Sequence, residues 1–411
     1  MSNFAFGTYR VNDLNPQHIQ ALKDAIVSGI EMIDTSSNYM DGAAERAIAL
    51  AFEGLEDKII DVEIVSKFGY IQGKTLQRYK NDISFSNSIT DVVLYSDDCY
   101  HSIAPAFLRD QLTHTLQRLK REQLDCYLLH NPEYYLLDAI RRGVDKDERL
   151  DEMYRRIELS FIALEKEVKK GRIISYGISS NSFSLSRMNE EFLPYEDLLT
   201  LAQNASYEVG NDKHSFTTIE LPINILETEG LKCASWAKAN GLRVLANRPL
   251  NAQYNGAMYR LAEYDDSKEY YNYFNELIEM CEKNENLEPL VSLLEELDTN
   301  KHRFAWIGSY DMYYYSQMLP YIKKILQEAE EDALEGLLEL IELFLQEYRK
   351  SVAYECSEKT KQKLENFFYK CNATLQECAL EFLLKEQNID YTLVGMRKPS
   401  YVQQILALKN R

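Results

Sequence analysis

Several common signatures of nucleotide and metal binding are missing from this 411-residue sequence. No two of its 16 glycines are spaced as Gly-x-Gly, which excludes the fingerprint of a Rossmann dinucleotide-binding domain. The P-loop pattern Gly-x4-Gly-Lys-Ser/Thr is absent, and so is His-Glu-x-x-His. The six histidines form no close pair typical of a zinc site, so we expect no metal centre. Any nucleotide cofactor must therefore be held in another way.

Positive charge and long apolar runs are also scarce. Lys+Arg total 46 against 65 Asp+Glu, a net charge of −19, which argues against binding to nucleic acid or to an anionic membrane. No window holds about 18 uninterrupted apolar residues, so we expect no transmembrane helix. The first residues, MSNFAFGTYRVND, lack a basic region followed by an apolar run, so we expect a cytoplasmic protein without a signal peptide. The seven cysteines are scattered without Cys-x-x-Cys, and we expect reduced thiols.

Short β-type runs alternate with helical patterns over the first 250 residues. The predicted strands are Phe4–Arg10, Glu31–Ser36, Val62–Phe68, Leu124–His130, Ile174–Ser180, Leu198–Asn204 and Arg243–Pro249. The predicted helices between them are Gln17–Val27, Ala43–Phe52, Pro105–Leu119 and Arg155–Lys170. A last helix–strand–helix set follows at Thr374–Lys385, Tyr391–Met396 and Ser400–Leu408. Eight β/α units in order predict an α/β fold, a (β/α)8 TIM barrel, rather than an open sheet.

Residues 256–370 interrupt this alternation. They hold 24 Asp+Glu against 13 Lys+Arg, and they carry 13 of the 29 tyrosines. Leu334, Leu337, Ile341, Leu345 and Tyr348 follow a helical spacing with acidic residues elsewhere. We therefore expect a barrel formed by residues 1–255 and 371–411, with an acidic, Tyr-rich helical insertion at 256–370 between strands seven and eight. The insertion is interpreted as a solvated helical lobe, with a lid or a partner-binding surface as the alternative.

Four ionisable side chains that could take part in acid–base chemistry lie at the same end of neighbouring predicted strands. They are Asp34 and Tyr39 after the second strand, Lys67 at the end of the third and His130 at the end of the fourth. A barrel places its active site at the C-terminal ends of its strands. A tyrosine is a poor acid at neutral pH, but a nearby ammonium stabilises its phenolate and a carboxylate keeps that ammonium charged. Individually, each residue is also typical of a barrel ion pair, a packed aromatic or a core histidine.

The segments IDTSSNY, VSKFG and YLLHNPE resemble the aldo-keto reductase superfamily. The resemblance covers about residues 4–254 and 371–411. It implies that Tyr39 is the general acid/base, that Lys67 and Asp34 tune it, and that His130 positions the substrate carbonyl. It further implies reduction of aldehydes and ketones with NAD(P)H, without a metal, and with the cofactor extended across the barrel mouth.

The same resemblance implies a set of cofactor-binding positions. Around the nicotinamide, it points to Gly7, Thr8, Tyr9 and Asp34, to Ser180 and Asn181 in Gly-Ile-Ser-Ser-Asn, and to Gln203 on the sixth strand. The doubled serine leaves open whether Ser180 or Asn181 reaches the carboxamide. Near the adenosine phosphate, the turn Gly395-Met396-Arg397-Lys398-Pro399-Ser400 resembles the family's Gly-x-Arg/Lys turn, and Gly395, Arg397 and Ser400 are the expected contacts.

The seventh strand departs from the family pattern Tyr-Ser-Pro-Leu. It ends Ala246-Asn247-Arg248-Pro249-Leu250, so no aromatic ring is present to stack on the nicotinamide. Arg248 is interpreted either as a pyrophosphate ligand or as an exposed loop arginine. Gln403 and Gln404 stand where the family has an acidic residue and an asparagine.

Taken together, these features predict an oxidoreductase that acts on a small carbonyl or alcohol substrate. The cluster of Arg397, Lys398 and Ser400 favours NADP as the cofactor, with NAD as the alternative. The resemblance favours a monomer. The competing hypothesis is a cofactor-binding regulatory protein that uses the helical lobe to bind a protein partner.

Overall fold

The computed structural model describes residues 3–55, 58, 61–328, 334, 336–368 and 371–409. Its central feature is a closed barrel of eight parallel strands, ordered β1-β13-β10-β9-β8-β7-β3-β2 around the barrel. The barrel strands are β1 (Asn3–Gly7), β2 (Met32–Asp34), β3 (Glu63–Phe68), β7 (Leu124–His130), β8 (Ile173–Ser179), β9 (Phe216–Pro222), β10 (Arg243–Asn247) and β13 (Tyr391–Val394). Each pairs with the next barrel strand along the chain, and β13 pairs with β1. The predicted (β/α)8 barrel is confirmed.

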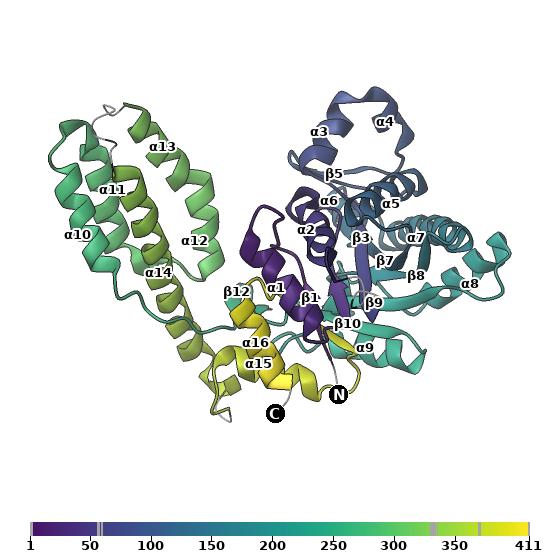
Figure 1. The fold of residues 1–411 in the computed structure, drawn as a ribbon. Helices are drawn as coiled ribbons and strands as arrows, with labels where there is room; N and C mark the ends of the chain where they lie inside the picture. Colours follow the sequence, from purple (N-terminus) through teal and green to yellow (C-terminus); the bar gives the residue numbers. More distant parts are fainter. Residues whose placement is uncertain are drawn as a thin grey trace. The chain divides into compact units, whose positions relative to one another are not determined.

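Helices follow the strands and surround the barrel (Figure 1). They are α1 (Pro16–Val27), α2 (Ala43–Phe52), α5 (Pro105–Leu119), α6 (Tyr134–Arg141), α7 (Lys146–Lys169), α8 (Leu198–Val209), α9 (Gly230–Ala239), α15 (Leu375–Lys385) and α16 (Pro399–Lys409). Local sequence explains several of their ends. Asn15 caps α1 by accepting the Gln17 N–H at 3.0 Å, and Asp145 caps α7 by accepting the Asp147 N–H at 2.9 Å.

The sixth strand is not where the sequence pattern predicts it. Residues 198–204 lie in helix α8, and the strand is β9, which begins at Phe216. The prediction is wrong because Leu198, Ala202 and Ala205 are buried at a helical spacing. The β9 residues Thr218 and Glu220 are also buried, so this strand lacks the uniform apolar pattern of its neighbours.

A small antiparallel sheet occupies the long loop after β3. It is formed by β4 (Tyr70–Ile71), β6 (Cys99–His101) and β5 (Val93–Ser96), with β6 in the middle. Two short helices, α3 (Gly73–Asn81) and α4 (Ile83–Ser88), lie between β4 and β5. The register pairs Tyr70 with His101, so this sheet places an aromatic residue and a histidine immediately after the end of β3.

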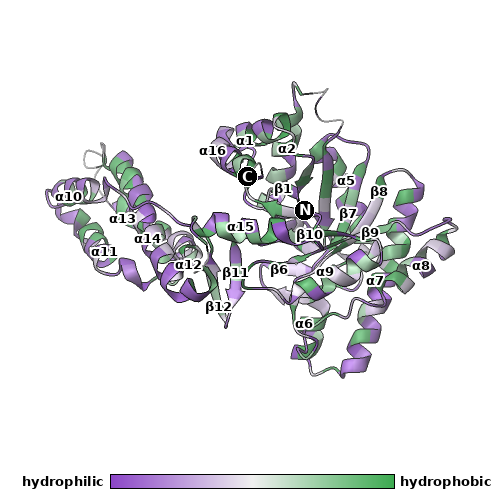
Figure 2. Cartoon of the chain, turned by 90° about the horizontal axis from the view of Figure 1, so that it is seen from below, coloured by the Kyte–Doolittle hydropathy of each residue, from purple (hydrophilic) through white to green (hydrophobic). Residues whose placement is uncertain are grey.

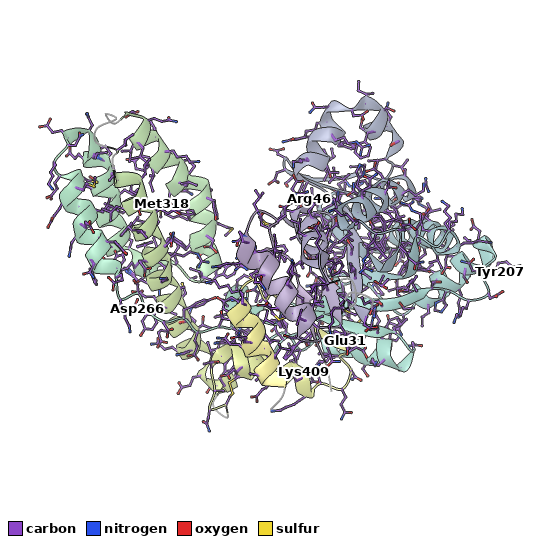
Figure 3. All side chains as sticks on the ribbon, in the orientation of Figure 1. Glu31, Arg46, Tyr207, Asp266, Met318 and Lys409 are labelled. Carbon is purple, nitrogen blue, oxygen red and sulfur yellow. A yellow bond between two sulfur atoms is a disulfide. The ribbon has the colours of Figure 1, made fainter. Side chains whose placement is uncertain are left out.

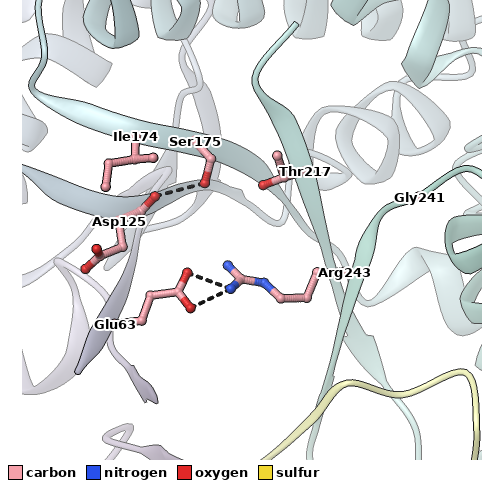
Figure 4. A pocket seen from close by; sticks show the side chains of 7 residues that line it. All are labelled: Glu63, Asp125, Ile174, Ser175, Thr217, Gly241 and Arg243. Atoms are coloured by element: carbon pink, nitrogen blue, oxygen red, sulfur yellow. Dashed lines mark hydrogen bonds and ion pairs between the residues drawn. The ribbon is translucent and has the colours of Figure 1, made fainter. Parts of the chain in front are cut away.

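An ion pair lies at the N-terminal end of the barrel, where strands β3 and β10 begin. Arg243 donates to both carboxylate oxygens of Glu63, one of them at 2.6 Å, and Asp125 accepts the Ile64 N–H at 2.8 Å. These residues line an open pocket of about 380 Å³ together with Ser175 and Thr217 (Figure 4). This pocket is at the opposite end of the strands from Asp34, Lys67 and His130.

The chain divides into two compact units, residues 1–249 with 381–411 and residues 250–380. The second unit lies in the chain between β10 and β13. It contains the hairpin β11 (Asn251–Tyr254) and β12 (Ala257–Arg260), then α10 (Tyr270–Cys281), α11 (Glu288–Thr299), α12 (Ile307–Tyr313), α13 (Leu319–Glu328) and α14 (Leu337–Phe368). Helices α10 to α14 therefore lie in the chain between the seventh and eighth barrel strands, and the second unit extends beyond the predicted 256–370 at both ends.

The second unit has its own hydrophobic core. The predicted stripe is buried at Leu337, Ile341, Leu345 and Tyr348 on α14. Met318, labelled in Figure 3, is buried in the same cluster. Hydrophobic and hydrophilic residues alternate around the helices in Figure 2, as expected for amphipathic helices that share one core.

The cysteines depart from the expectation of reduced thiols. Cys371 and Cys378 form a disulfide across the start of α15, and the other five are buried free thiols. None of the helices in the described ranges is both long and apolar enough to span a membrane.

Candidate active site

The four predicted catalytic residues come from three neighbouring strands, and the structure brings them together. Lys67, on β3, is fully buried and forms an ion pair with Asp34 at the end of β2. Its Nζ also donates to the Thr35 carbonyl at 3.2 Å and to the Tyr39 hydroxyl at 3.4 Å. His130 ends β7, and its ring centroid is 6.0 Å from that of Tyr39.

A tight turn carries Tyr39 from β2 to this position. The 3-10 segment Tyr39–Gly42 follows, and both Met40 and Asp41 adopt left-handed backbone conformations. Gly42 has a φ of +79°, and a Cβ there would lie 2.8 Å from the Arg118 side chain. Glycine is therefore required where the turn enters α2.

Glu220 is a buried acid that the sequence reasoning missed. It lies on β9, and its Oε2 is 3.2 Å from the Lys67 Nζ. Its Oε1 accepts hydrogen bonds from the Ser179 hydroxyl at 3.0 Å and from the Asn247 amide at 2.9 Å. Lys67 thus faces two buried carboxylates. No local pattern marks Glu220, because Thr217 and Thr218 interrupt the apolar residues of β9 and the stronger apolar pattern lies in α8.

Burial and the second carboxylate, Glu220, shift the pKa values of this cluster. Burial raises the pKa of Asp34 well above its usual range, Glu220 raises it further, and Lys67 opposes both. Burial lowers the pKa of Lys67, but the two carboxylates outweigh it and the net shift is upward. Burial likewise raises the pKa of Tyr39, and the Lys67 ammonium offsets only part of this. The Lys67 ammonium stabilises the Tyr39 phenolate, as expected. Because burial has the larger effect, the Tyr39 side chain is still a neutral phenol in the protein without ligands.

His130 is a neutral imidazole at neutral pH. Burial lowers its pKa well below the usual value, with further contributions from Lys67 and His101. Its Nδ1 lies 3.1 Å from the Ser36 hydroxyl, and its backbone carbonyl accepts a hydrogen bond from His101 Nε2 at 2.8 Å. These contacts fix the ring beside Tyr39.

Aromatic rings surround the catalytic cluster. Tyr9 is 63% exposed and packs edge-on against Tyr39, with ring centroids 5.2 Å apart. Tyr70 packs against His130 at 4.8 Å and against Tyr134 at 5.2 Å. The Tyr70 hydroxyl accepts a hydrogen bond from Asn131, so the ring is held in place next to His130.

Comparison with known proteins decides the family. The model of the aldo/keto reductase family matches residues 3–410. The chain belongs to the aldo/keto reductase family. No curated protein matches it significantly by sequence.

Several solved aldo-keto reductases are similar in structure. The holo form of aldo-keto reductase AKR11C1 from Bacillus halodurans is 13% identical, with 100% of this chain and 87% of that chain covered and a TM-score of 0.48. A Klebsiella pneumoniae aldo/keto reductase in complex with NADP and acetate is 14% identical, with coverage of 99% and 86% and a TM-score of 0.45. The glycerol dehydrogenase AKR11B4 from Gluconobacter oxydans is 15% identical, with coverage of 99% and 90% and a TM-score of 0.48.

Within this aldo/keto reductase, the predicted nicotinamide-binding residues differ in whether their side chains are already hydrogen-bonded to other protein groups. Gly7 ends β1 and pairs in register with Asp34, and the Thr8 hydroxyl donates to the Asp34 carbonyl at 2.8 Å. The Ser180 hydroxyl is buried and donates to Glu133 at 2.8 Å. The Asn181 side chain is exposed. Of the two open alternatives, Asn181 is therefore the one with a free side chain.

Glu133 is a second buried acid that the sequence reasoning did not single out. It also accepts the Asn181 backbone N–H at 2.9 Å, so it ties the end of β7 to the end of β8. Burial raises the pKa of Glu133 to about 7, although hydrogen bonds from Ser180 and Asn181 oppose the shift. The signal was the glutamate of His-Asn-Pro-Glu directly after β7.

Gln203 does not lie on a barrel strand, which corrects the sequence prediction. It is an exposed residue of α8, four residues before Tyr207, which is 88% exposed and labelled in Figure 3. Residues four apart share one face of a helix, so Gln203 belongs to the outer surface. The barrel residue of the sixth strand that faces Lys67 is Glu220.

Arg248 and the C-terminal turn occupy two further predicted cofactor positions. Arg248 has a φ of +51° and forms an ion pair with Glu227 at 2.6 Å, so it is neither free nor fully exposed. Gly395 lies close to β1, because a Cβ there would be 3.9 Å from the Gly7 carbonyl oxygen. Beyond it, an open cavity of about 470 Å³ is lined by Pro16, Gln17, Gln20, Lys398, Pro399 and Ser400. Arg397 is not among these lining residues. Burial lowers the pKa of His18, and the charge of Arg397 lowers it further.

The residues present fit a nicotinamide cofactor at both ends. The cavity has Lys398 and Ser400 beside the N-terminus of α16, which suits a phosphate. At the other end, Asn247 Oδ1 is buried and has no hydrogen-bond partner among the described residues. It offers an acceptor for an N–H of the carboxamide.

Proposed function

We propose that this chain is an NAD(P)H-dependent oxidoreductase that reduces an aldehyde or ketone to an alcohol, or catalyses the reverse reaction. Tyr39 is the general acid/base. The observation that carries the proposal is the buried Lys67, which is ion-paired with Asp34 and Glu220 and donates to the Tyr39 hydroxyl at 3.4 Å. Burying a lysine and two carboxylates costs desolvation free energy, and buried ionisable groups of this kind cluster at functional sites.

The cofactor supplies a hydride to the carbonyl carbon when it is bound. Tyr39 holds the proton that the carbonyl oxygen then requires. Lys67 stabilises the phenolate that remains, and Asp34 and Glu220 keep Lys67 charged throughout. Because burial holds the pKa of Tyr39 above its usual value, the proton is present on the phenol at neutral pH.

The proposed cofactor is NADP, with Lys398 and Ser400 as the contacts to the adenosine phosphate. Asn181 and Asn247 hold the carboxamide. Arg397 and Arg248 are less favoured than the sequence predicts, since Arg248 is paired with Glu227 and Arg397 does not line the cavity. The proposed substrate is a small carbonyl compound or the corresponding alcohol.

The test is NADPH oxidation against a panel of aldehydes and ketones, with Tyr39→Phe and the matched control Tyr207→Phe. Tyr39→Phe is expected to keep cofactor binding and to lose about 10²–10⁴-fold in kcat/KM, the usual contribution of a general acid. Tyr207→Phe removes a hydroxyl from an exposed ring on the outer surface of α8 and should retain activity. Equal activity of wild type and Tyr39→Phe would overturn the role of Tyr39. Cofactor binding without turnover of any carbonyl would favour a regulatory protein instead.

A further inference from the structure

Ser36 lies in the chain between Asp34 and Tyr39. Its side chain is buried, and its hydroxyl contacts His130. Its Oγ lies 2.7 Å from Asn38 Oδ1, 3.1 Å from His130 Nδ1 and 3.4 Å from the Lys67 carbonyl. A serine hydroxyl has a single hydrogen to donate, so these partners compete for it. Which one receives it determines which nitrogen of His130 carries a proton.

Gln72 decides this competition by orienting the Asn38 amide. The Asn38 Nδ2 donates to Gln72 Oε1 at 3.2 Å, which turns Oδ1 toward Ser36. The Gln72 carbonyl oxygen can only accept, so it faces the NH2 group of Asn38 and leaves Asn38 Oδ1 for Ser36.

The count of donors then has one solution. Asn38 Oδ1 can only accept, so Ser36 donates its hydrogen along this 2.7 Å contact. The Ser36 oxygen is left as an acceptor, so His130 must carry its proton on Nδ1 and donate it to Ser36. A neutral imidazole holds one ring proton, which leaves Nε2 as a bare acceptor.

We propose that Ser36, oriented by Asn38, is a positioning residue that fixes His130 as the Nδ1–H tautomer. Nε2 has no hydrogen-bond partner among the described residues and presents its lone pair. In the reaction proposed above, on which this consequence rests, His130 accepts a hydrogen bond from a substrate hydroxyl and does not donate one to the carbonyl oxygen. Tyr39 is then the one proton donor of the four catalytic residues. Carbonyl substrates that carry a neighbouring hydroxyl are favoured over those without one.

The tautomer can be measured in the free protein by nitrogen NMR with labelled histidine. The His130→Gln variant assigns the signal among the six histidines. The expected result is a protonated Nδ1 in the wild type and in the matched control Ser37→Ala. Asn38→Ala removes the acceptor, so Ser36 turns its hydrogen to Nδ1 and the proton should move to Nε2. Ser36→Ala removes the partner of Nδ1 and should also lose the pure Nδ1–H form.

Two results overturn the proposal: a wild-type signal with Nε2 protonated, or an Asn38→Ala signal that still shows Nδ1–H. A second readout compares kcat/KM for hydroxyacetone and acetone. The wild type is expected to prefer hydroxyacetone, and Asn38→Ala to reduce this preference about fivefold, as for one hydrogen bond. An unchanged preference in Asn38→Ala counts against the role of Nε2. If neither ketone nor any other carbonyl is reduced, the proposed function fails, but the tautomer measurement is unaffected.

Discussion

Replacing Lys67 by methionine removes the one positive charge from a buried cluster that contains two carboxylates. Asp34 and Glu220 are 3% and 2% exposed, and Lys67 is fully buried. Methionine fills similar space, so the main effect is electrostatic rather than a cavity. Without Lys67, both acids lie in a low-dielectric interior without this counter-ion, and nothing from Lys67 opposes the burial and the Glu220 charge that raise the pKa of Asp34.

The expected cost at pH 7 is about 3–5 kcal/mol of unfolding free energy, the usual result of leaving a buried charge without its partner. That is a large share of the roughly 5–15 kcal/mol that stabilises a typical domain. The loss should shrink in acid. Burial and Glu220 hold the pKa of Asp34 above its unfolded value, so stability is lost as pH rises through this interval and regained as pH falls. One proton bound only by the folded state returns about 1.4 kcal/mol per pH unit, hence about 3 kcal/mol between pH 7 and pH 5.

The assay is urea unfolding of wild type, Lys67→Met and Lys67→Met/Glu220→Gln at pH 7 and pH 5. The double variant removes one of the two unpaired charges and should be more stable at pH 7 than Lys67→Met alone. The matched control is Arg243→Met, which breaks the Glu63 ion pair at the N-terminal end of the barrel and should not be rescued by Glu220→Gln. Equal losses for Lys67→Met at both pH values, without rescue by Glu220→Gln, would refute the charge arrangement described here.

Two further predictions concern the protonation of Glu133 and the choice of cofactor. Because burial raises the pKa of Glu133 to about 7, the wild type should lose roughly 3 kcal/mol of stability as pH rises from about 4.5 to 7 through this group. Glu133→Gln should lack this part of the slope, and unfolding at several pH values measures it; parallel slopes would contradict the assignment. Lys398→Ala should weaken NADPH at least tenfold more than NADH, because only NADPH carries the extra phosphate. Calorimetric dissociation constants decide this, and equal weakening of both cofactors would remove Lys398 from the phosphate site.

Much of the barrel could be predicted from the sequence because its strands are buried on both sides. Such strands are short, mostly apolar runs, and those ending at Asp34, Phe68 and His130 could be located directly. The sixth strand could not be found in this way, because its interior residues Thr218 and Glu220 are polar. The apolar residues of α8 form the stronger local pattern, so the sequence places the sixth strand at residues 198–204.

Only the site residues that lie in local sequence motifs could be predicted. Asp34, Tyr39 and Lys67 meet because their strands are adjacent, so correct strand ends suffice to group them. Glu220, Asn247 and Ser36 act through contacts between distant segments, and the sequence gives no local sign of those contacts. The direction of the Tyr39 pKa shift was also out of reach, since it depends on how burial compares with the charge of Lys67.

The central claim is that a hydride passes from a nicotinamide cofactor to a carbonyl carbon beside Tyr39. The most direct measurement supplies NADPH deuterated at the transferred position of the nicotinamide and analyses the alcohol product by mass spectrometry. We expect deuterium on the carbinol carbon with the wild type and little product with Tyr39→Phe. Alcohol without deuterium, or no alcohol from any carbonyl in the panel, would contradict it.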